Sequence, residues 1–365
     1  MIPLKKVIVA MSGGVDSSVT AALMVEAGYE VIGVTMRLGA PDTIEVETER
    51  PNCCSLEGVE DARRVATQLG IPFYAVNYEE LFREKIVDYF AEEYLAGRTP
   101  SPCVICNRDL KFGKLLNLAD QLECDYVATG HYTRIEHDAQ TGRYLLRKAR
   151  YPQKDQSYFL FLLTQDQLSR SLMPLGEYTK DEVREIARKY KLLTAEKQES
   201  QELCFIADGD YRRFLKDRVP EKIKGGEIVD KDGNVLGKHQ GIPFYTIGQR
   251  RKLGIAVGMP IYVTQINVED NTIVVGQPED LLHDTMQVER INLIAIDELT
   301  QPIRASVKIR SRDEGGLATI YPLSNTEVEV KFDEPRRAIT PGQATVFYDG
   351  ELIIGGGWIK SRTKS

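Results

Sequence analysis

One short segment constrains this chain more than any other: a glycine-serine loop between an apolar run and a helical run. The apolar run covers Val7 to Ala10, the loop reads Ser12-Gly13-Gly14-Val15-Asp16-Ser17, and helical apolar spacing continues to Ala27. Adjacent glycines let the backbone approach an anion, and the helix that follows presents its positive N-terminal end. The segment therefore predicts a strand–loop–helix unit that holds phosphate.

The same loop excludes the commonest phosphate-binding class. No lysine follows the glycines, so this is not the GxxxxGK(S/T) loop that grips the β- and γ-phosphates in kinases and GTPases. An SGGxDS string at the start of a first helix resembles the ATP loop of pyrophosphatase-type enzymes. Those enzymes split ATP between the α- and β-phosphates and adenylate an oxygen of the substrate. Asp16 is then expected to orient Mg²⁺ or the loop itself.

The order of the predicted elements indicates the fold class. Four strand-like runs, at 7–10, 31–36, 73–76 and 126–129, alternate with helix-like runs, one of which covers Glu79 to Ala96. This alternation predicts an α/β domain with a doubly wound parallel sheet. The segment from Tyr132 to Lys148 predicts a hairpin with a turn near Gly142. Pro100 and Pro102 argue against a helix before about Cys106. From about Gly225, glycine turns and short alternating runs predict a small central β-rich domain and a C-terminal β-barrel. The expected domains are 1–206, 207–284 and 285–365.

Composition and charge limit the setting in which the chain works. No apolar run approaches the ~20 residues of a membrane span, and the apolar stretch near the N-terminus is too short for a signal sequence. We therefore expect a cytoplasmic protein with no membrane partner. A net charge of -7 argues against a general nucleic-acid coat. Basic clusters such as Arg250-Arg251-Lys252 and Arg336-Arg337 leave a selective RNA partner open, with solvated faces as the alternative.

Cysteine is the second source of chemistry. A cytosolic chain of this size does not use cysteines as a disulfide framework, so grouped thiols indicate metal, cluster or redox chemistry. Cys103 and Cys106 form a CxxC that Pro102 precedes and a predicted helix follows, and a thiol at a helix N-terminus has a lowered pKa. A zinc site would need two more ligands, for which no paired spacing is present. Cys124 is interpreted as structural, and Cys53-Cys54 as a loop pair without an assigned role.

An adenylating loop and reactive thiols in one chain predict a combined chemistry. Adenylation converts a carbonyl oxygen into a leaving group, AMP, which a persulfide or sulfide can then displace. Cys204 stands alone in Gln198 to Phe205, and this chemistry gives it a role that burial as a core side chain would not.

With these residues in place, the chain resembles the tRNA-specific 2-thiouridylase family over essentially its whole length. Eight ordered blocks carry the resemblance: AMSGGVDSSV from Ala10, GVTMRL from Gly33, AGRTPSPCVICNRDLKF from Ala96, ATGHY from Ala128, KDQSYFL from Lys154, QESQELCFI from Gln198, TIGQRRKLGI from Thr246 and TPGQATVFYDGELIIGGGWI from Thr340.

The resemblance implies a role for each matching position. The ATP pocket would be lined by Ala10, Met11, Ser12, Gly13, Gly14, Val15, Asp16, Ser17, Met36 and Gly130. Cys106 would be the nucleophile and Cys204 the persulfide carrier, and the two would close a transient disulfide. The target base would face Ser101, Pro102 and Cys103, and other tRNA contacts would come from His131, Lys154, Asp155, Gln156, Arg310, Ser311 and Gln343.

The family's reaction sets the expected function and partners. Its members replace oxygen by sulfur at C2 of the wobble uridine in the tRNAs for Lys, Glu and Gln, using ATP and Mg²⁺. The central domain would be a tRNA-binding linker. A cysteine desulfurase or a sulfur-relay protein would supply the sulfur. The resemblance thus implies a tRNA-uridine 2-sulfurtransferase.

Two positions depart from the family pattern. Many members carry an aspartate where this chain has Cys103, and an aromatic residue is expected where it has Ser311. With Cys103 in place of the aspartate, the chain has three candidate thiolate ligands, Cys103, Cys106 and Cys204. Three thiolates suit a 4Fe–4S cluster whose fourth iron is open and could hold sulfide. We state this cluster as a hypothesis.

Two other classes of function compete with thiolation. An amide-forming ligase with the same loop, similar to GMP synthetase or argininosuccinate synthetase, would need an ammonia source or an amino-acid site and would leave Cys106 and Cys204 without a task. A non-catalytic iron–sulfur RNA-binding protein would release no pyrophosphate when given tRNA and ATP.

Overall fold

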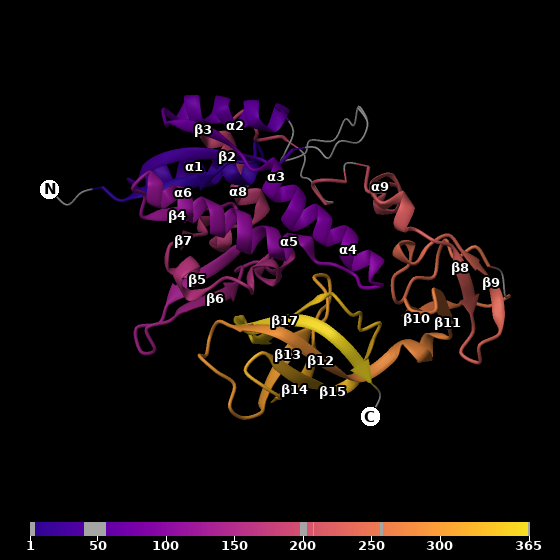
Figure 1. Cartoon of the computed structure of the whole chain (residues 1–365). Helices are drawn as coiled ribbons and strands as arrows, with labels where there is room; N and C mark the ends of the chain where they lie inside the picture. The colour runs from indigo at the N-terminus through magenta and orange to yellow at the C-terminus, as the bar shows by residue number, and fades with distance from the viewer. Residues whose placement is uncertain (1–3, 40–55, 198–202, 207, 256–257, 364–365) are drawn as a thin grey trace. The chain divides into compact units, whose positions relative to one another are not determined.

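The structure is a computed structural model, and it describes residues 4–39, 56–197, 203–206, 208–255 and 258–363 (Figure 1). The chain divides into two compact units. Unit 1 comprises Met1–Val87, Cys103–Gly209 and Glu351–Ile353, and unit 2 comprises Asp88–Pro102, Asp210–Gly350 and Ile354–Ser365. Cys53 and Cys54 lie outside the described residues.

A five-stranded parallel sheet forms the centre of unit 1, in the order β3-β2-β1-β4-β7. Its strands are β1 (Lys6–Ala10), β2 (Glu30–Arg37), β3 (Phe73–Asn77), β4 (Tyr126–Ala128) and β7 (Ser171–Leu172). The four strands predicted from the sequence are present, and β7 is an additional short edge strand.

Helices cover both faces of this sheet, as the alternation of side chains along β1 requires. Val7 and Val9 pack in one buried cluster with α1 (Val15–Glu26), α2 (Leu56–Leu69) and α8 (Lys180–Lys189). Ile8 points to the opposite face and packs in a second cluster with α6 (Leu115–Gln121). Because successive side chains of a strand point to opposite faces, a strand that is apolar throughout is buried on both sides. The doubly wound arrangement is therefore confirmed.

The helix predicted over Glu79 to Ala96 is divided into three segments. It consists of α3 (Glu79–Phe82), a π-helical segment η1 (Arg83–Asp88) and α4 (Tyr89–Leu95), and the division between the two units falls at Val87 and Asp88. A π-helical turn contains one residue more than an α-helical turn, so the side chains that follow it point to a different face of the helix. The apolar periodicity predicted the helix but not this interruption.

The prediction that no helix begins before about Cys106 was wrong. Helix α5 (Pro102–Ile105) begins at Pro102 and continues through a second π-helical segment, η2 (Cys106–Lys114), into α6. Proline is favoured at the first position of a helix, where its missing N–H has no intrahelical partner in any case. Cys103 is consequently the thiol at the helix start, and Cys106 lies one turn further along.

The remaining elements of unit 1 follow the sheet. The predicted hairpin is confirmed as β5 (Thr133–His137) and β6 (Tyr144–Lys148), with Gly142 in its turn at φ +71. Three short 3₁₀ segments and α7 (Gln165–Ser169) lead to α8, and Thr164 and Thr179 form capping boxes at the starts of α7 and α8. The 3₁₀ segments are η3 (Pro152–Lys154), η4 (Ser157–Leu160) and η5 (Pro174–Glu177).

Besides α4, unit 2 contains two β structures and helix α9 (Tyr211–Arg218). A four-stranded sheet has the order β10-β11-β8-β9. Three short 3₁₀ segments lie before β8, between β9 and β10, and after β11. The bounds are η6 (Pro220–Lys222), β8 (Gly226–Val229), β9 (Val235–His239), η7 (Ile242–Phe244), β10 (Tyr262–Asn267), β11 (Thr272–Gly276) and η8 (Pro278–Leu281).

The second β structure is the predicted C-terminal barrel. Its strands run in the order β12-β15-β14-β13-β16-β17, and antiparallel pairing of β12 with β17 closes it. The inward side chains form a single buried cluster that includes Val288, Val307 and Phe347. The bounds are β12 (Leu282–Leu293), β13 (Ile303–Lys308), β14 (Gly316–Pro322), β15 (Glu327–Arg337), β16 (Ala344–Asp349) and β17 (Leu352–Thr363).

Within the part of the chain that the structure describes, no helix has the length and apolar character needed to cross a membrane.

Candidate active site

The predicted phosphate loop lies where the sequence places it, between the carboxyl end of β1 and the start of α1. The Ser12 N–H donates to Ser17 Oγ over 3.1 Å, and the hydroxyl groups of Ser17 and Ser18 donate to the Gly14 carbonyl at 3.1 and 2.8 Å. These hydrogen bonds fold the loop onto the first turn of α1. Ligands of doubly wound sheets bind at this edge, outside the carboxyl ends of the strands.

Gly13 has two structural reasons to be glycine. Its φ of +73 lies in the left-handed region that side chains disfavour. A Cβ at this position would also lie 2.2 Å from the carbonyl oxygen of Gly58, near the start of α2. The loop therefore packs directly against backbone, and a side chain here would push the two apart.

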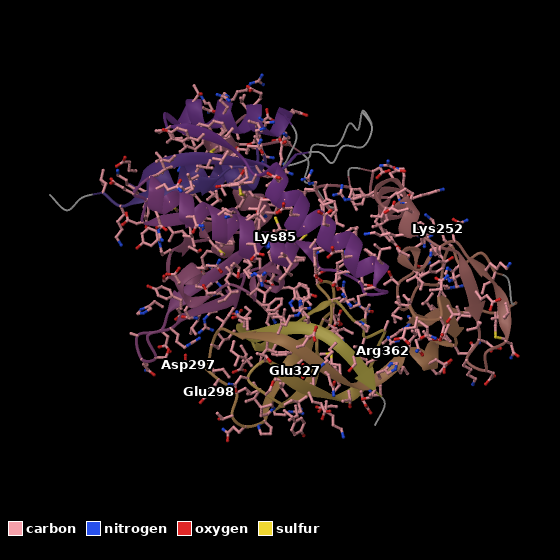
Figure 2. All side chains as sticks on the ribbon, viewed as in Figure 1. Lys85, Lys252, Asp297, Glu298, Glu327 and Arg362 are labelled. Carbon is pink, nitrogen blue, oxygen red and sulfur yellow. The ribbon has the colours of Figure 1, made fainter. Side chains whose placement is uncertain are left out.

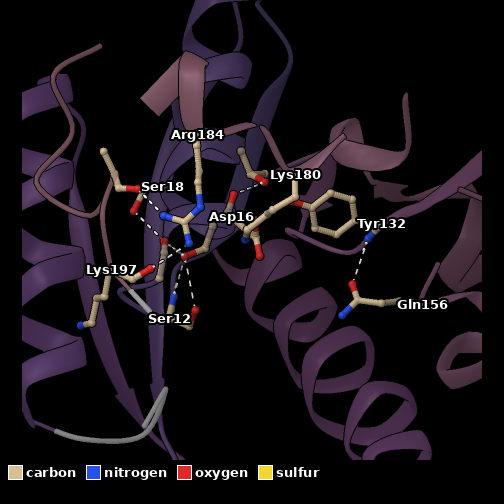
Figure 3. Close-up of polar contacts among 12 residues, drawn as sticks. Ser12, Asp16, Ser18, Tyr132, Gln156, Lys180, Arg184 and Lys197 are labelled. Carbon is tan, nitrogen blue, oxygen red and sulfur yellow. Dashed lines mark hydrogen bonds and ion pairs between the residues drawn. The ribbon is translucent and has the colours of Figure 1, made fainter. Parts of the chain in front are cut away.

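Asp16 is held by two donors that come from distant parts of the sequence (Figure 3). Its Oδ1 accepts from Tyr132 Oη at 2.6 Å and from Lys180 Nζ at 2.7 Å. The Lys180 side chain is 13% exposed and that of Asp16 31% exposed, so water screens this ion pair less than a surface pair. The prediction assigned Asp16 to Mg²⁺ or to the loop, and the contacts show that it anchors the loop to α8.

One turn further along α8, Arg184 contacts the segment that precedes Cys204. Its Nη1 donates to the Ala195 carbonyl at 2.7 Å and its Nη2 to the Lys197 carbonyl at 3.3 Å. Lys197 Nζ in turn forms an ion pair with Asp61 of α2 at 2.5 Å. Helix α8 thus contacts both the phosphate loop and the chain that leads towards Cys204.

Three other residues predicted for the ATP pocket lie at or near the carboxyl ends of β1, β2 and β4. Gly130 follows β4, and a Cβ there would lie 3.0 Å from the Asp16 carbonyl carbon and 3.1 Å from the Ser17 nitrogen. Met11 is buried, and its N–H donates to the Val34 carbonyl at 2.8 Å. Met36 is half-buried near the end of β2. The structure therefore brings Gly130 against the loop, as the prediction requires.

The thiols of unit 1 differ in exposure. Cys103 is exposed, Cys106 is buried and Cys204 is intermediate. Beside Cys106, the amide nitrogen of Asn107 donates to the Phe159 carbonyl at 3.1 Å, while its buried amide oxygen accepts no hydrogen bond from the described residues. Cys124 is buried too, and burial raises the pKa of its thiol, as expected for a structural cysteine.

The described residues do not assemble an iron–sulfur site. Among them, no group of three His, Cys, Asp or Glu side chains is arranged to hold a metal ion, so Cys103, Cys106 and Cys204 are not gathered as a ligand set. The cluster does not fit the residues in this conformation. Mg²⁺ in ATP sites is held by one or two carboxylates together with the phosphates, so a Mg²⁺ site would not need three protein side chains of this kind.

Several residues predicted to contact tRNA have structural partners in unit 1. Gln156 Oε1 accepts from the Tyr132 N–H at 3.0 Å (Figure 3), and Asp155 accepts from Ala149 and from both the N–H and the hydroxyl of Ser157. Gln156 therefore holds the chain at Tyr132, just before β5, and Asp155 holds it at Ala149, just after β6. Lys154 is partly exposed beside them.

His131 is buried in unit 1. Its ring is 8% exposed, Nδ1 lies 2.8 Å from Thr129 Oγ1, and Phe112 packs against it at 5.8 Å between ring centroids. Burial, with a smaller contribution from the Lys111 charge, lowers the pKa of His131 well below its usual value. The imidazole is therefore neutral at physiological pH.

In unit 2, two predicted tRNA contacts lie on adjoining segments. Gln343 Nε2 donates to the carbonyls of Thr99 and Pro100 at 3.2 Å each, and the Ala344 N–H donates to Ser101 Oγ at 3.2 Å. The barrel thereby fixes the chain immediately before Pro102.

Arg310 and Ser311 project from an exposed turn between β13 and β14. Asp313 anchors this turn, because its carboxylate accepts from the Ile309 N–H at 3.0 Å and from Arg336 Nη2 at 2.6 Å. The side chain of Ser311 is exposed at this turn.

The contacts of Lys180 and Tyr132 with Asp16 were not predicted from the sequence. The Thr179–Glu182 pattern does mark the start of α8, so it places Lys180 at the first turn. No local signal connects that turn to Asp16, which is 164 residues away.

A parallel α/β domain with an anchored serine-glycine loop at the end of its first strand defines a nucleotide-binding domain. Residues 5–208 match a family model described as a tRNA methyl transferase HUP domain. Residues 212–277 match a tRNA methyl transferase PRC-barrel domain, and residues 283–359 match an aminomethyltransferase beta-barrel domain.

Full-length relatives identify the family. The chain is 52% identical over 358 residues to the tRNA-specific 2-thiouridylase MnmA of Carboxydothermus hydrogenoformans, covering 98% of both chains. It is 51% identical to that of Clostridium acetobutylicum, covering 98% of this chain and 99% of the relative. The chain belongs to the tRNA-specific 2-thiouridylase family. Among solved structures it is similar to the NMN synthetase of Francisella tularensis, at 17% identity and a TM-score of 0.35 over 60% of this chain and 87% of that one.

Proposed function

We propose that this chain is a tRNA-uridine 2-sulfurtransferase that uses ATP to replace oxygen by sulfur at C2 of the wobble uridine in the tRNAs for Lys, Glu and Gln. The observation that carries the proposal is that two features occur together in unit 1. This unit holds both an ATP-type loop, anchored through Asp16 and Lys180, and the thiols Cys106 and Cys204. The names of the full-length relatives support the same activity.

The first step is adenylation. The C2 oxygen of the uridine attacks the α-phosphorus of ATP, a P–O bond breaks, and pyrophosphate leaves. Loop N–H groups and the N-terminus of α1 stabilise the negative charge on the phosphates. Mg²⁺, when bound, neutralises phosphate charge, and Asp16 is the carboxylate of the loop that would face it. Lys180 adds a positive charge at the same place.

The second step is sulfur transfer. The terminal sulfur of a persulfide on Cys204 attacks C2, and the C–O bond to AMP breaks. The Cys106 thiolate then attacks the Cys204 sulfur, the S–S bond of the persulfide breaks, and the sulfur stays on the base. A transient Cys106–Cys204 disulfide remains, and an external thiol reduces it. The persulfide would come from a cysteine desulfurase or a sulfur-relay protein. Such a reaction belongs in the cytoplasm, where tRNA and reducing thiols are available.

We further propose that three domains divide this work. The catalytic domain would span 1–206, a central tRNA-binding linker 207–284 and the barrel 285–365. The ranges of the three matching family models support this division. Base contacts would come from Ser101, Pro102 and Cys103, and tRNA contacts from His131, Lys154, Asp155, Gln156, Arg310, Ser311 and Gln343.

The family models carry names that refer to methyl transfer, whereas the relatives are named for thiolation. The proposal rests on the names of the relatives, because the two relatives are 52% and 51% identical to this chain and each alignment covers 98% of it. An amide-forming ligase leaves the cysteines without a task, and a non-catalytic RNA-binding protein leaves the anchored loop without one.

The test is thiolation of unmodified tRNA with ATP and two alternative donors, a protein persulfide and sulfide. Cys103→Asp and Cys103→Ala are compared with the unaltered enzyme. If Cys103→Ala keeps full activity with both donors, Cys103 is neither a ligand nor an acid/base group. Anaerobic purification followed by iron analysis decides the cluster hypothesis, and a fully active iron-free enzyme would refute it.

A further inference from the structure

A polar cavity in unit 2 has no role in the reaction described above. Its volume is about 720 Å³, within the ~300–1,000 Å³ typical of ligand sites. Residues of β10, β11 and β17, of the turn after β8 and of the start of β12 line it, together with Gly97, Ile247 and Pro341. Polar side chains predominate near β10 and β17, namely Thr264, Gln265, Asn267 and Ser361.

Arg362, near the end of β17, is one of the residues that line this cavity. Figure 2 labels its side chain. Its Nη1 donates to the Ile339 carbonyl and its Nη2 to the Thr264 carbonyl. Among the described residues, no carboxylate forms an ion pair with it. Two other arginines of the barrel differ in this respect: Arg304 pairs with Asp333 at 2.6 Å and Arg336 with Asp313 at 2.6 Å.

Burial without a counter-charge is unfavourable for Arg362. Desolvation lowers the pKa of its side chain to about 10, which still leaves it charged at physiological pH. A partly buried charge without an ionic partner keeps much of its desolvation cost. An anion in the cavity would offset that cost.

The other charged groups of the cavity leave room for an anion. Lys231 is exposed at its edge, and Lys360 is paired with Glu327 at 2.7 Å. Both carboxylates of the cavity accept hydrogen bonds from nearby backbone. Asp230 accepts from the N–H groups of Asp232 and Asn234, and Asp280 accepts from the Gln277 N–H at 2.8 Å. Arg362 and Lys231 are therefore the cations available to a ligand.

We propose that this cavity binds a backbone phosphate of the RNA substrate, with the Arg362 guanidinium as the main contact and Lys231 as the second. The planar guanidinium matches the geometry of phosphate oxygens, and the hydroxyl and amide groups nearby suit a ribose. This inference rests on the proposed function, which supplies RNA as the ligand.

The test measures the affinity of the full-length protein for unmodified tRNA over a series of salt concentrations. Each phosphate contact contributes about one unit to the slope of log K against log salt. Arg362→Gln should lower the magnitude of the slope by about one and weaken binding about 3- to 10-fold at moderate salt. Arg362→Lys should keep the slope but bind more weakly, since it retains the charge and loses the planar group.

Arg304→Gln is the matched control, because it makes the same change in net charge at an arginine that already has a carboxylate partner. It should leave the slope unchanged. If Arg362→Gln fails to fold, Lys231→Gln replaces it, since that side chain is exposed and its slope should fall likewise. An unaltered slope in a folded Arg362→Gln or, failing that, Lys231→Gln variant refutes the phosphate site.

The proposed function is tested separately, by thiolation of the same tRNA with ATP and a sulfur donor. If the unaltered protein thiolates tRNA while the slopes do not change, the cavity proposal alone fails. If the unaltered protein thiolates no tRNA with ATP and a competent sulfur donor, the proposed function fails.

Discussion

At the scale of single residues, the contacts of Asp16 say most about how the phosphate loop is held. One carboxylate oxygen receives both a phenol and an ammonium group, from Tyr132 and Lys180. Hydrogen bonds that involve a charged group are worth ~1.5–3 kcal/mol, more than neutral ones. The loop therefore depends on a helix that the sequence places far from it.

Lys180→Met should impair the use of ATP while leaving the protein folded. Loss of the ammonium group removes both the anchor of Asp16 and a positive charge near the phosphates. We expect the KM for ATP to rise about tenfold or more, which corresponds to a loss of ~1.4 kcal/mol or more. The measurement is tRNA-dependent ATP–pyrophosphate exchange.

Lys189→Met is the control on the same helix. Its side chain is 68% exposed and its pair with Glu26 at 3.4 Å is a surface pair, so exchange should be unaffected. Equal effects of the two substitutions would show that α8 is merely destabilised and that Lys180 has no specific role.

His131 should contribute to the pH dependence of stability. Its pKa is lowered in the folded state by burial and by Lys111, so the unfolded state binds a proton first as the pH falls. The stabilisation is present above the unfolded pKa of ~6.5 and is lost as the pH falls below it, by up to about 1.4 kcal/mol per pH unit. The free energy of unfolding of His131→Gln, measured by denaturant between pH 7 and pH 5, should fall less steeply than that of the unaltered protein. Parallel pH profiles would contradict the assignment of a neutral buried imidazole.

At the scale of elements, the strand–loop–helix unit was predicted from the sequence almost completely, because its signals are local. Glycines with positive φ, apolar periodicity and capping residues each act within a few positions. The start of α5 at Pro102 and the π-helical segments η1 and η2 were not predicted. Such interruptions depend on packing against the rest of the molecule, which the periodicity of one helix does not contain.

Gly13→Ala separates backbone strain from steric contact when it is compared with Gly28→Ala. Both glycines have positive φ, +73 and +82, but a Cβ at Gly28 meets nothing within 4 Å, whereas one at Gly13 meets backbone at 2.2 Å. Gly28→Ala should cost ~1 kcal/mol of stability and keep ATP–pyrophosphate exchange. Gly13→Ala should abolish exchange or prevent folding. Full exchange activity in folded Gly13→Ala would show that the loop does not need its close approach to α2.

At the scale of the whole molecule, the doubly wound sheet and the barrel followed from the alternation of elements along the chain. The candidate site could be predicted only in part. The loop and the thiols are visible as motifs, but Lys180 reaches Asp16 only in the folded chain. The iron–sulfur hypothesis joined Cys103, Cys106 and Cys204 because they share a residue type, and the described structure does not bring them together as ligands.

The two halves of the proposed reaction should separate by substitution. Cys204→Ser should retain tRNA-dependent ATP–pyrophosphate exchange and lose thiolation, because adenylation precedes any use of a thiol. Cys124→Ser should retain both, since that thiol is buried and structural. Loss of exchange in a folded Cys204→Ser protein would show that the thiol takes part in adenylation itself.

The most direct test of the central claim is the mass of unmodified tRNA after incubation with the unaltered protein, ATP and a persulfide donor. We expect a gain equal to the exchange of one oxygen for one sulfur at the wobble uridine, with one AMP and one pyrophosphate released per tRNA. Omission of ATP should abolish the gain. Thiolation without ATP, or ATP cleavage to ADP and phosphate in step with thiolation, would contradict the proposed adenylation.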